Sequence, residues 1–310
     1  MRDVQLSRER APLLTSAGLA LAVGVVAVSV SGPLIAYAAA PALAIAFWRN
    51  ALALPLLVPA AAWRRRPELR ALAGSARRDA LLCALAGVAL AGHLMAWVPS
   101  TRMTSVATST ALVTTQPVWV GLIAVALGRR LTGWTWFGIA AAVLGAVSVT
   151  GLDLTLSRTA VLGDLLALLG GALAAVYTIL GERVRARVST TTYTLVCYGV
   201  CAAVVLAVCL VARVPLAGYP LSAWAAIVAV TIGPQLLGHS LVNFALRRVP
   251  ATTVSVVILL EAPGAALIAW AWLDQVPPLL AVPGLLLLLV GVAVVAAKDR
   301  KVTPQPPAAL

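Results

Sequence analysis

Two formal charges lie deep within apolar runs of this sequence, where they could bind an ion or a charged solute. Arg49 comes eight residues after Pro41, and Glu261 comes nine residues after Thr252. On helices these separations are about 12 and about 14 Å, close to the middle of a bilayer. A charge at that depth costs from about 3 to over 10 kcal/mol, and it persists mainly where it faces a cavity, a partner or a bound solute. We therefore expect both side chains to face the protein interior.

The chemistry of this pair has two interpretations. In the functional one, Arg49 orients an anionic group of a solute, and Glu261 takes up and releases a proton because poor solvation favours its neutral form. In the structural one, the two residues form a fixed ion pair that locks two parts of the chain together.

Other polar and aromatic residues inside apolar runs complete the candidate site. His93 and His239 are the only histidines, and for each of them packing or helix-to-helix bonding is favoured over a role in transport. Pro117 follows Thr114, Thr115 and Gln116, and Pro263 follows Glu261 by two residues, so both prolines predict a kink with polar groups near mid-membrane. The candidate binding or transport residues are Trp48, Arg49, His93, Trp97, Thr115, Gln116, Tyr177, His239, Asn243 and Glu261, with Pro117 and Pro263 at the kinks and no metal site.

The elements that must position these residues are membrane-spanning helices. The chain is 62% apolar and 11% charged, with a mean hydropathy of +1.00, which is more apolar surface than a soluble core of 310 residues buries. Lipid offers no partner to backbone groups, so runs of about 20 residues predict helices. Ten runs are found, and they predict an all-α integral membrane protein: Pro12–Ser31, Pro41–Ala62, Ala80–Val98, Ser105–Leu127, Trp134–Thr150, Leu162–Leu180, Thr191–Ala212, Leu221–Phe244, Thr252–Leu273 and Leu279–Ala297.

The distribution of positive charge predicts the orientation. With both termini in the cytoplasm, 19 of the 23 Lys and Arg residues fall in inside segments, and Arg102, Arg158 and Arg213 fall outside. This is the pattern of a multi-pass protein of the plasma membrane rather than of a nucleic-acid-binding face.

An internal repeat relates the two halves. Shifted by 146 residues, the stretch 92–149 aligns without gaps with 238–295, and the only two histidines, the two mid-helix prolines and three glycines fall in register. The halves 12–151 and 162–297 each hold five spans, and residues 298–310 form a cytoplasmic tail. Because five is odd, the second half enters the membrane from the opposite side. Inverted repeats of this kind recur in secondary transporters, which bind solute at the midplane and alternate access by rocking.

The sequence also resembles the EamA-type ten-helix transporters of the drug/metabolite transporter superfamily. The residues that carry the resemblance are AIAFWRN in the second run, HLMAWVPSTRMTSVATSTALVTTQPVWVGLIA across the third and fourth, and SVVILLEAPGAALIAWAWL in the ninth. The resemblance implies two five-helix repeats, a central cavity and transport of small metabolites, often export of amino acids or related compounds. Family members commonly carry Glu where this chain has Arg129 and Gln275, so a role for those acids does not transfer.

The expected function is secondary active transport of a small-molecule solute. No GxxxxGK motif is found, so we expect no ATP and no cofactor, with a proton as the coupling ion. An uncoupled facilitative permease or an ion channel is the alternative. An embedded enzyme is less favoured, because no HExxH, GxSxG or intramembrane carboxylate cluster occurs.

Overall fold

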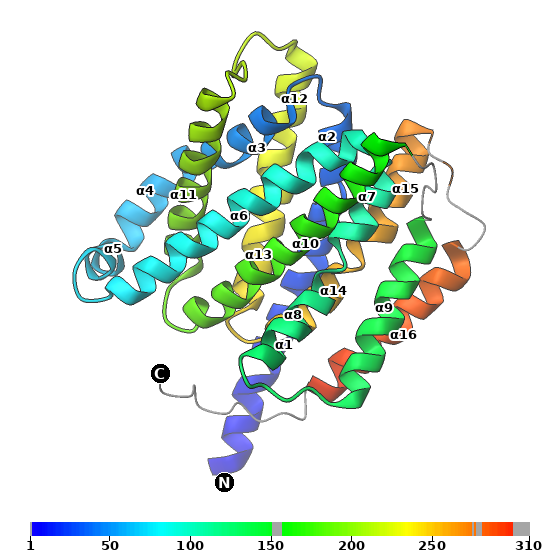
Figure 1. Ribbon diagram of the computed structural model, residues 1–310. Coiled ribbons are helices and arrows are strands. Elements are labelled where there is room, and N and C mark those ends of the chain that lie inside the picture. Colours follow the sequence, from blue (N-terminus) through cyan, green and yellow to red (C-terminus); the bar gives the residue numbers. More distant parts are fainter. Residues whose placement is uncertain (1, 151–156, 275, 277–280, 300–310) are drawn as a thin grey trace.

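The computed structural model is a bundle of helices and describes residues 2–150, 157–274, 276 and 281–299 (Figure 1). Eight helical stretches in this part of the chain are long and apolar enough to span a membrane, and two shorter apolar helices accompany them. Gln275, the first residues of the expected tenth run and tail residues 300–310 lie outside the described residues. The all-α membrane fold expected from the sequence is confirmed.

The helices follow the expected runs closely, but several runs are divided. In chain order they are α1 (Arg2–Ser29), α2 (Ser31–Tyr37), α3 (Ala42–Ala51), α4 (Leu54–Arg64), α5 (Arg66–Ala73), α6 (Arg77–Met103), α7 (Val106–Val113), α8 (Gln116–Ala126), α9 (Gly133–Thr150), α10 (Arg158–Arg185), α11 (Thr190–Val211), α12 (Leu221–Val230), η1 (Thr231–His239), α13 (Ser240–Ala245), α14 (Ala251–Ile258), α15 (Glu261–Leu273) and α16 (Ala281–Asp299).

The first span ends later than predicted. The expected end was Ser31, but helix α2 continues the span to Tyr37 after a one-residue interruption at Val30. Pro33 lies in the first turn of α2, where a proline does not remove a helical hydrogen bond.

The fourth and ninth spans break where the prolines predicted. Helix α7 ends at Val113 and α8 begins at Gln116, with Pro117 in its first turn. Helix α14 ends at Ile258 and α15 begins at Glu261, with Pro263 in its first turn. Each break leaves backbone groups near the centre of the bundle that are not part of a regular helix.

The eighth span contains a π-helix that the sequence did not predict. Helix η1 runs over Thr231–His239 between α12 and α13, and Pro234 lies inside it. The wider π turn shifts the register of the side chains that follow, and such segments occur frequently at functional sites.

Equivalent helices of the two repeats pack in reciprocal pairs. Helix α6 of the first repeat packs along α10 of the second, and η1 of the second packs along α1 of the first. Helix α9 lies side by side with α16 (Figure 1). There Gly145 lies against the backbone of Leu288, and Gly291 lies against the backbone of Ala142. Small residues let these two helices approach closely, as expected for helices that associate in lipid.

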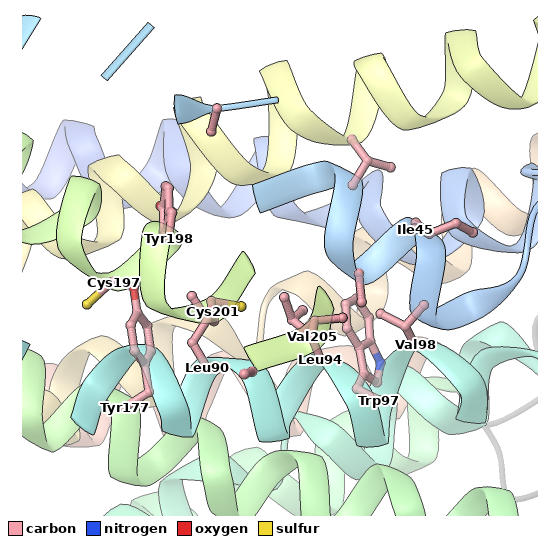
Figure 2. Close-up of a cluster of buried hydrophobic side chains, with 14 of the residues drawn as sticks. Ile45, Leu90, Leu94, Trp97, Val98, Tyr177, Cys197, Tyr198, Cys201 and Val205 are labelled. Carbon is pink, nitrogen blue, oxygen red and sulfur yellow. The ribbon is translucent and has the colours of Figure 1, made fainter. Parts of the chain in front are cut away.

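The largest buried cluster among the described residues draws most of its members from α6, α11 and α12. Figure 2 shows Leu90, Leu94 and Trp97 of α6 facing Cys201 and Val205 of α11. All four cysteines are buried and free, as expected for cysteines inside apolar runs. This rigid packing holds one wall of the cavity described next.

Candidate functional site

A cavity of about 50 Å³ lies where the two repeats meet. Both halves line it, since its walls come from α1, α2 and α6 to α8 of the first repeat and from α10, η1 and α13 to α15 of the second. The lining residues are Val28, Ser31, Leu90, His93, Trp97, Val113, Thr114, Gln116, Ala174, Tyr177, Thr178, His239, Val242, Ile258 and Glu261. Six of the predicted candidates are thus brought together: His93, Trp97, Gln116, Tyr177, His239 and Glu261.

Glu261 is a carboxyl group in this cavity and is 9% exposed. It is the first residue of α15, so it stands at the positive end of that helix and directly after the break in the ninth span. Within the described residues, ion pairs join Arg129 to Glu182 and Arg187 to Asp79, whereas Arg49 and Glu261 form none. The fixed ion pair considered from the sequence is therefore not formed in this structure.

Arg49 lies beside the cavity rather than in its lining. Its Nε donates a 2.8 Å hydrogen bond to Oε1 of Gln235, and its Nη1 lies 3.4 Å from Oγ of the cavity residue Ser31. The side chain is fully buried, and its Nη2 has no partner among the described residues. A buried guanidinium without a carboxylate is costly, and it is suited to receive an anion.

Gln235 and Asn50 hold the Arg49 side chain in place. Nε2 of Gln235 donates a 2.8 Å hydrogen bond to Oδ1 of Asn50, and Nδ2 of Asn50 donates to the carbonyl of Ala46. The hydroxyl of Tyr198 donates to the backbone carbonyl of Gln235. Sequence reasoning missed this support, although Asn50 adjoins Arg49 and Gln235 is a polar residue inside an apolar run next to Pro234.

The two histidines line the cavity from equivalent positions. Nδ1 of His93 donates a 2.9 Å hydrogen bond to the carbonyl of Gly170, and its ring stacks on Trp97. The ring of His239 lies edge-on to Tyr177. His93 thus joins α6 to α10, which is the helix-to-helix bond that the sequence analysis favoured for it.

The side chains of two neighbouring threonines at the break in the fourth span have different surroundings. Thr114 lines the cavity, whereas Thr115, the predicted candidate, is not part of the lining and donates to the carbonyl of Leu112. Nε2 of Gln116 donates a 2.7 Å hydrogen bond to Oγ1 of Thr178, a lining residue that the sequence analysis did not select.

A buried polar chain continues from one side of the cavity. Nδ2 of Asn243 donates a 2.6 Å hydrogen bond to the hydroxyl of Tyr177, and Nε of Arg185 donates a 3.0 Å hydrogen bond to the backbone carbonyl of Asn243. Arg185 also donates to the carbonyl of Val188 and to Oγ1 of Thr190. Asn243 therefore lies behind Tyr177 and reaches the cavity only through it.

The two tryptophan candidates lie in different places. Trp97 lines the cavity, and its Nε1 is buried and has no hydrogen-bond partner within the part of the chain that the structure describes. Trp48 lies outside the cavity, where its Nε1 donates a 2.8 Å hydrogen bond to the carbonyl of Leu216 and its ring packs edge-on against Trp224.

The residues in and beside this cavity could complement both acidic and basic groups of a small solute. The cavity lining includes one carboxyl group, two imidazoles and an indole ring, and the guanidinium of Arg49 lies beside the lining residue Ser31. No group of three or more His, Cys, Asp or Glu residues that could hold a metal ion occurs among the described residues. These side chains can form hydrogen bonds and ion pairs, and the carboxyl group and the imidazoles can exchange protons.

Comparisons with known proteins agree with this fold. Residues 15–151 and 161–297 each match the model of a protein family described as "EamA-like transporter family", which confirms the resemblance inferred from the sequence. A solved structure described as "Crystal structure of protein" is 20% identical, with a TM-score of 0.71, and the alignment covers 92% of this chain and 99% of that one. At this identity the likeness shows the shared fold. The search of curated proteins found no match.

Proposed function

Because the chain belongs to the EamA-like transporter family, we propose that it is a proton-coupled secondary transporter that exports small metabolites, such as amino acids or related compounds, from the cell. A transporter family is not enzymatic, so an embedded enzyme is excluded. We place the protein in the plasma membrane with both termini in the cytoplasm. With that orientation, 19 Lys and Arg residues fall in the segments on the cytoplasmic side.

The observation that carries the proposal is Glu261 in the cavity between the repeats. In a poorly solvated site at mid-membrane, the protonated, neutral form of a carboxyl group is favoured over the ionised form. Glu261 forms no ion pair with Arg49, so no close cation holds this carboxyl group in its ionised form. In our proposal proton uptake at Glu261 alternates with binding of the solute.

Arg49 supplies the complementary part of the site in this proposal. The unpartnered Nη2 atom would form a charge-assisted hydrogen bond with a carboxylate or another anionic group of the solute. The indole N–H of Trp97 is a second unpartnered donor in the same region. A solute with an amino group and a carboxylate would place the amino group toward Glu261 and the carboxylate toward Arg49.

The size of the cavity supports alternating access. About 50 Å³ holds on the order of three or four water molecules, which is less than an amino acid requires. The repeats must therefore rock apart to admit the solute. In this proposal they move about the helix breaks at Thr114–Thr115 and Leu259–Leu260.

Transport by reconstituted vesicles tests the proposal. Metabolite profiling of medium from cells that overexpress the protein, compared with Arg49→Ala, identifies the solute. Uptake or release of that solute is then measured with and without a pH gradient. We expect Glu261→Gln to lose the response to the gradient while the protein inserts normally. The matched control is Asp274→Asn, which makes the same carboxylate-to-amide change at an exposed residue after the ninth span and should keep the response.

Two results separate the alternatives. Transport by Glu261→Gln with an unchanged pH response contradicts proton coupling through this residue. Solute flux that equilibrates in the wild type but never exceeds its own gradient identifies an uncoupled facilitative permease instead.

A further inference from the structure

A cluster of arginines surrounds the connection between α4 and α6, far from the cavity. Arg64, Arg65, Arg66, Arg70, Arg77 and Arg78 are all exposed, and the indole of Trp63 at the end of α4 is 86% exposed. We call these seven residues the basic platform. Helix α5, which carries Arg66 and Arg70, lies beside the end of α4 and the start of α6 (Figure 1).

The arginines of the basic platform have no hydrogen-bond or ion-pair partner among the described residues. Within the described ranges none of their six guanidinium groups donates a hydrogen bond or forms an ion pair, whereas Arg129 and Arg187 pair with Glu182 and Asp79. The positive charge of the platform is therefore available to bind a partner outside the protein.

The acidic residues of the same connection face the other way. Glu68 accepts hydrogen bonds from the backbone N–H and the hydroxyl of Ser189 and from the hydroxyl of Thr192, and so caps the start of α11. Asp79 accepts three hydrogen bonds from Nε and Nη2 of Arg187. These contacts fix α5 and the start of α6 on the bundle and remove both carboxylates from the platform. Neither carboxylate forms an ion pair with an arginine of the platform.

The platform lies at the end of an apolar surface. Helix α4 exposes Leu56 and Val58 and then, one to two turns later, Trp63 and Arg64. The change from exposed aliphatic residues to an exposed indole and then to arginines is the order met when a spanning helix leaves the hydrocarbon and enters the headgroup layer. A soluble anion would bind the arginines, but it would not require the exposed indole or the adjoining apolar surface.

We propose that the basic platform is a binding site for anionic phospholipid headgroups. The arginines bind the phosphate groups, Trp63 lies at the level of the headgroups, and the acyl chains run along the exposed side of α4. Clusters of four to eight basic residues next to a membrane helix bind anionic lipid in this way. The occupied platform holds the connection between the second and third spans against the bilayer surface.

Lipid binding to the purified full-length protein tests this proposal independently of transport. Native mass spectrometry measures the affinity for phosphatidylglycerol and for the zwitterionic phosphatidylcholine, with inorganic phosphate as a competitor. We expect phosphatidylglycerol to bind more tightly, and the triple variant Arg65→Gln, Arg66→Gln, Arg70→Gln to bind it at least about tenfold more weakly. The matched control, Arg130→Gln, Arg183→Gln, Arg247→Gln, removes the same charge from three other exposed arginines and should keep the wild-type affinity.

Three results would overturn the proposal. They are equal affinity for the two lipids, equal loss of affinity in both triple variants, and displacement of phosphatidylglycerol by millimolar phosphate, which would indicate a site for a free anion. A second measurement covers the case in which the triple variant does not fold. A photoactivatable phosphatidylglycerol should label residues 63–78 of the unmodified protein, and labelling spread evenly over the other basic connections contradicts a specific site.

Discussion

Arg49 donates a 2.8 Å hydrogen bond from its Nε to Oε1 of Gln235, and this bond joins the second span to the π-helix of the eighth. The two residues are 186 positions apart in the chain, and both are fully buried. A charge from one repeat is thus held by an amide from the other, at the edge of the cavity that both repeats line. The geometry of Arg49 depends on how the two repeats are placed.

Removing the amide of Gln235 should therefore destabilise the protein. In Gln235→Leu a buried guanidinium N–H loses its acceptor, which costs about 1 to 3 kcal/mol. We expect a lower melting temperature in detergent. Leu237→Ala, at an exposed apolar residue of the same π-helix, should change it much less. If Gln235→Leu has the same melting temperature as the wild type, Arg49 has found another hydrogen-bond acceptor.

The hydroxyl of Tyr177 has a similar role on the other side of the cavity. Tyr177→Phe removes the 2.6 Å hydrogen bond from Asn243, whose Oδ1 already lacks a partner among the described residues. A buried amide left unpaired costs about 1 to 3 kcal/mol, so we expect reduced thermal stability. Tyr37→Phe makes the identical change at an exposed residue and serves as the control. Equal melting temperatures for the two variants would contradict a structural role for the Tyr177 hydroxyl.

The contact of α9 with α16 predicts that Gly145 tolerates no side chain. A Cβ atom at Gly145 would overlap the backbone nitrogen of Leu288, and a main chain cannot move aside as a flexible side chain does. We expect Gly145→Ala to lower the stability by about 1 to 3 kcal/mol or to reduce the yield of folded protein. Gly133→Ala, in the same helix but with open space around it, should behave like the wild type. Normal stability of Gly145→Ala would mean that the two helices are not so closely packed.

The sequence predicted the framework because its signals are local and strong. Apolar runs, alternating positive charge and the prolines at 117 and 263 each reflect a constraint on one segment, and the helices and breaks follow them. Glu261 was selected for the same reason, since a carboxyl group in an apolar run needs an interior location, and it lies in the cavity.

The directions of neighbouring side chains were harder to predict. Successive residues of a helix point about 100° apart, so Arg49 and Trp48 face different neighbours. Arg49 turns toward Gln235 and Ser31 beside the cavity, whereas Trp48 turns toward Leu216. At the break beside Pro117 the backbone is irregular, and nothing in the sequence decides that Thr114 rather than Thr115 lines the cavity. Gln235 was missed because a π-helix leaves no periodic pattern that separates it from an ordinary helix.

The cap formed by Glu68 predicts a dependence of stability on pH. Burial opposes ionisation of this carboxyl group, but the hydrogen bonds from Ser189 and Thr192 outweigh it and lower the pKa of Glu68 below its ordinary value of 4.5. A lowered pKa in the folded state adds stability that is present above the unfolded pKa and is lost as the pH falls through the folded one. Because the group is partly exposed, solvent screens its charge and the effect should be modest.

Melting temperatures measured from about pH 7 down to about pH 3 check this dependence. Part of the decrease on the acid side should disappear in Glu68→Gln, which cannot ionise. If the wild type and Glu68→Gln lose stability in parallel over this range, the cap does not depend on the charge of Glu68.

In our proposal, two repeats inserted in opposite directions enclose the cavity. Residues 128 and 274 are equivalent in the 146-residue shift, and both end a helix with a positive φ, 81° at Gly128 and 57° at Asp274. Arg130 and Asp274 are exposed beyond these two ends. Since the four native cysteines are buried, single cysteines introduced at 130 and 274 can be labelled selectively.

Labelling of intact cells with a membrane-impermeant maleimide is the most direct measurement of that claim. We predict that Asp274→Cys reacts from outside and that Arg130→Cys reacts only after the cells are permeabilised. Reaction of both cysteines from the same side would contradict the inverted repeat, and with it the shared cavity of His93, His239 and Glu261.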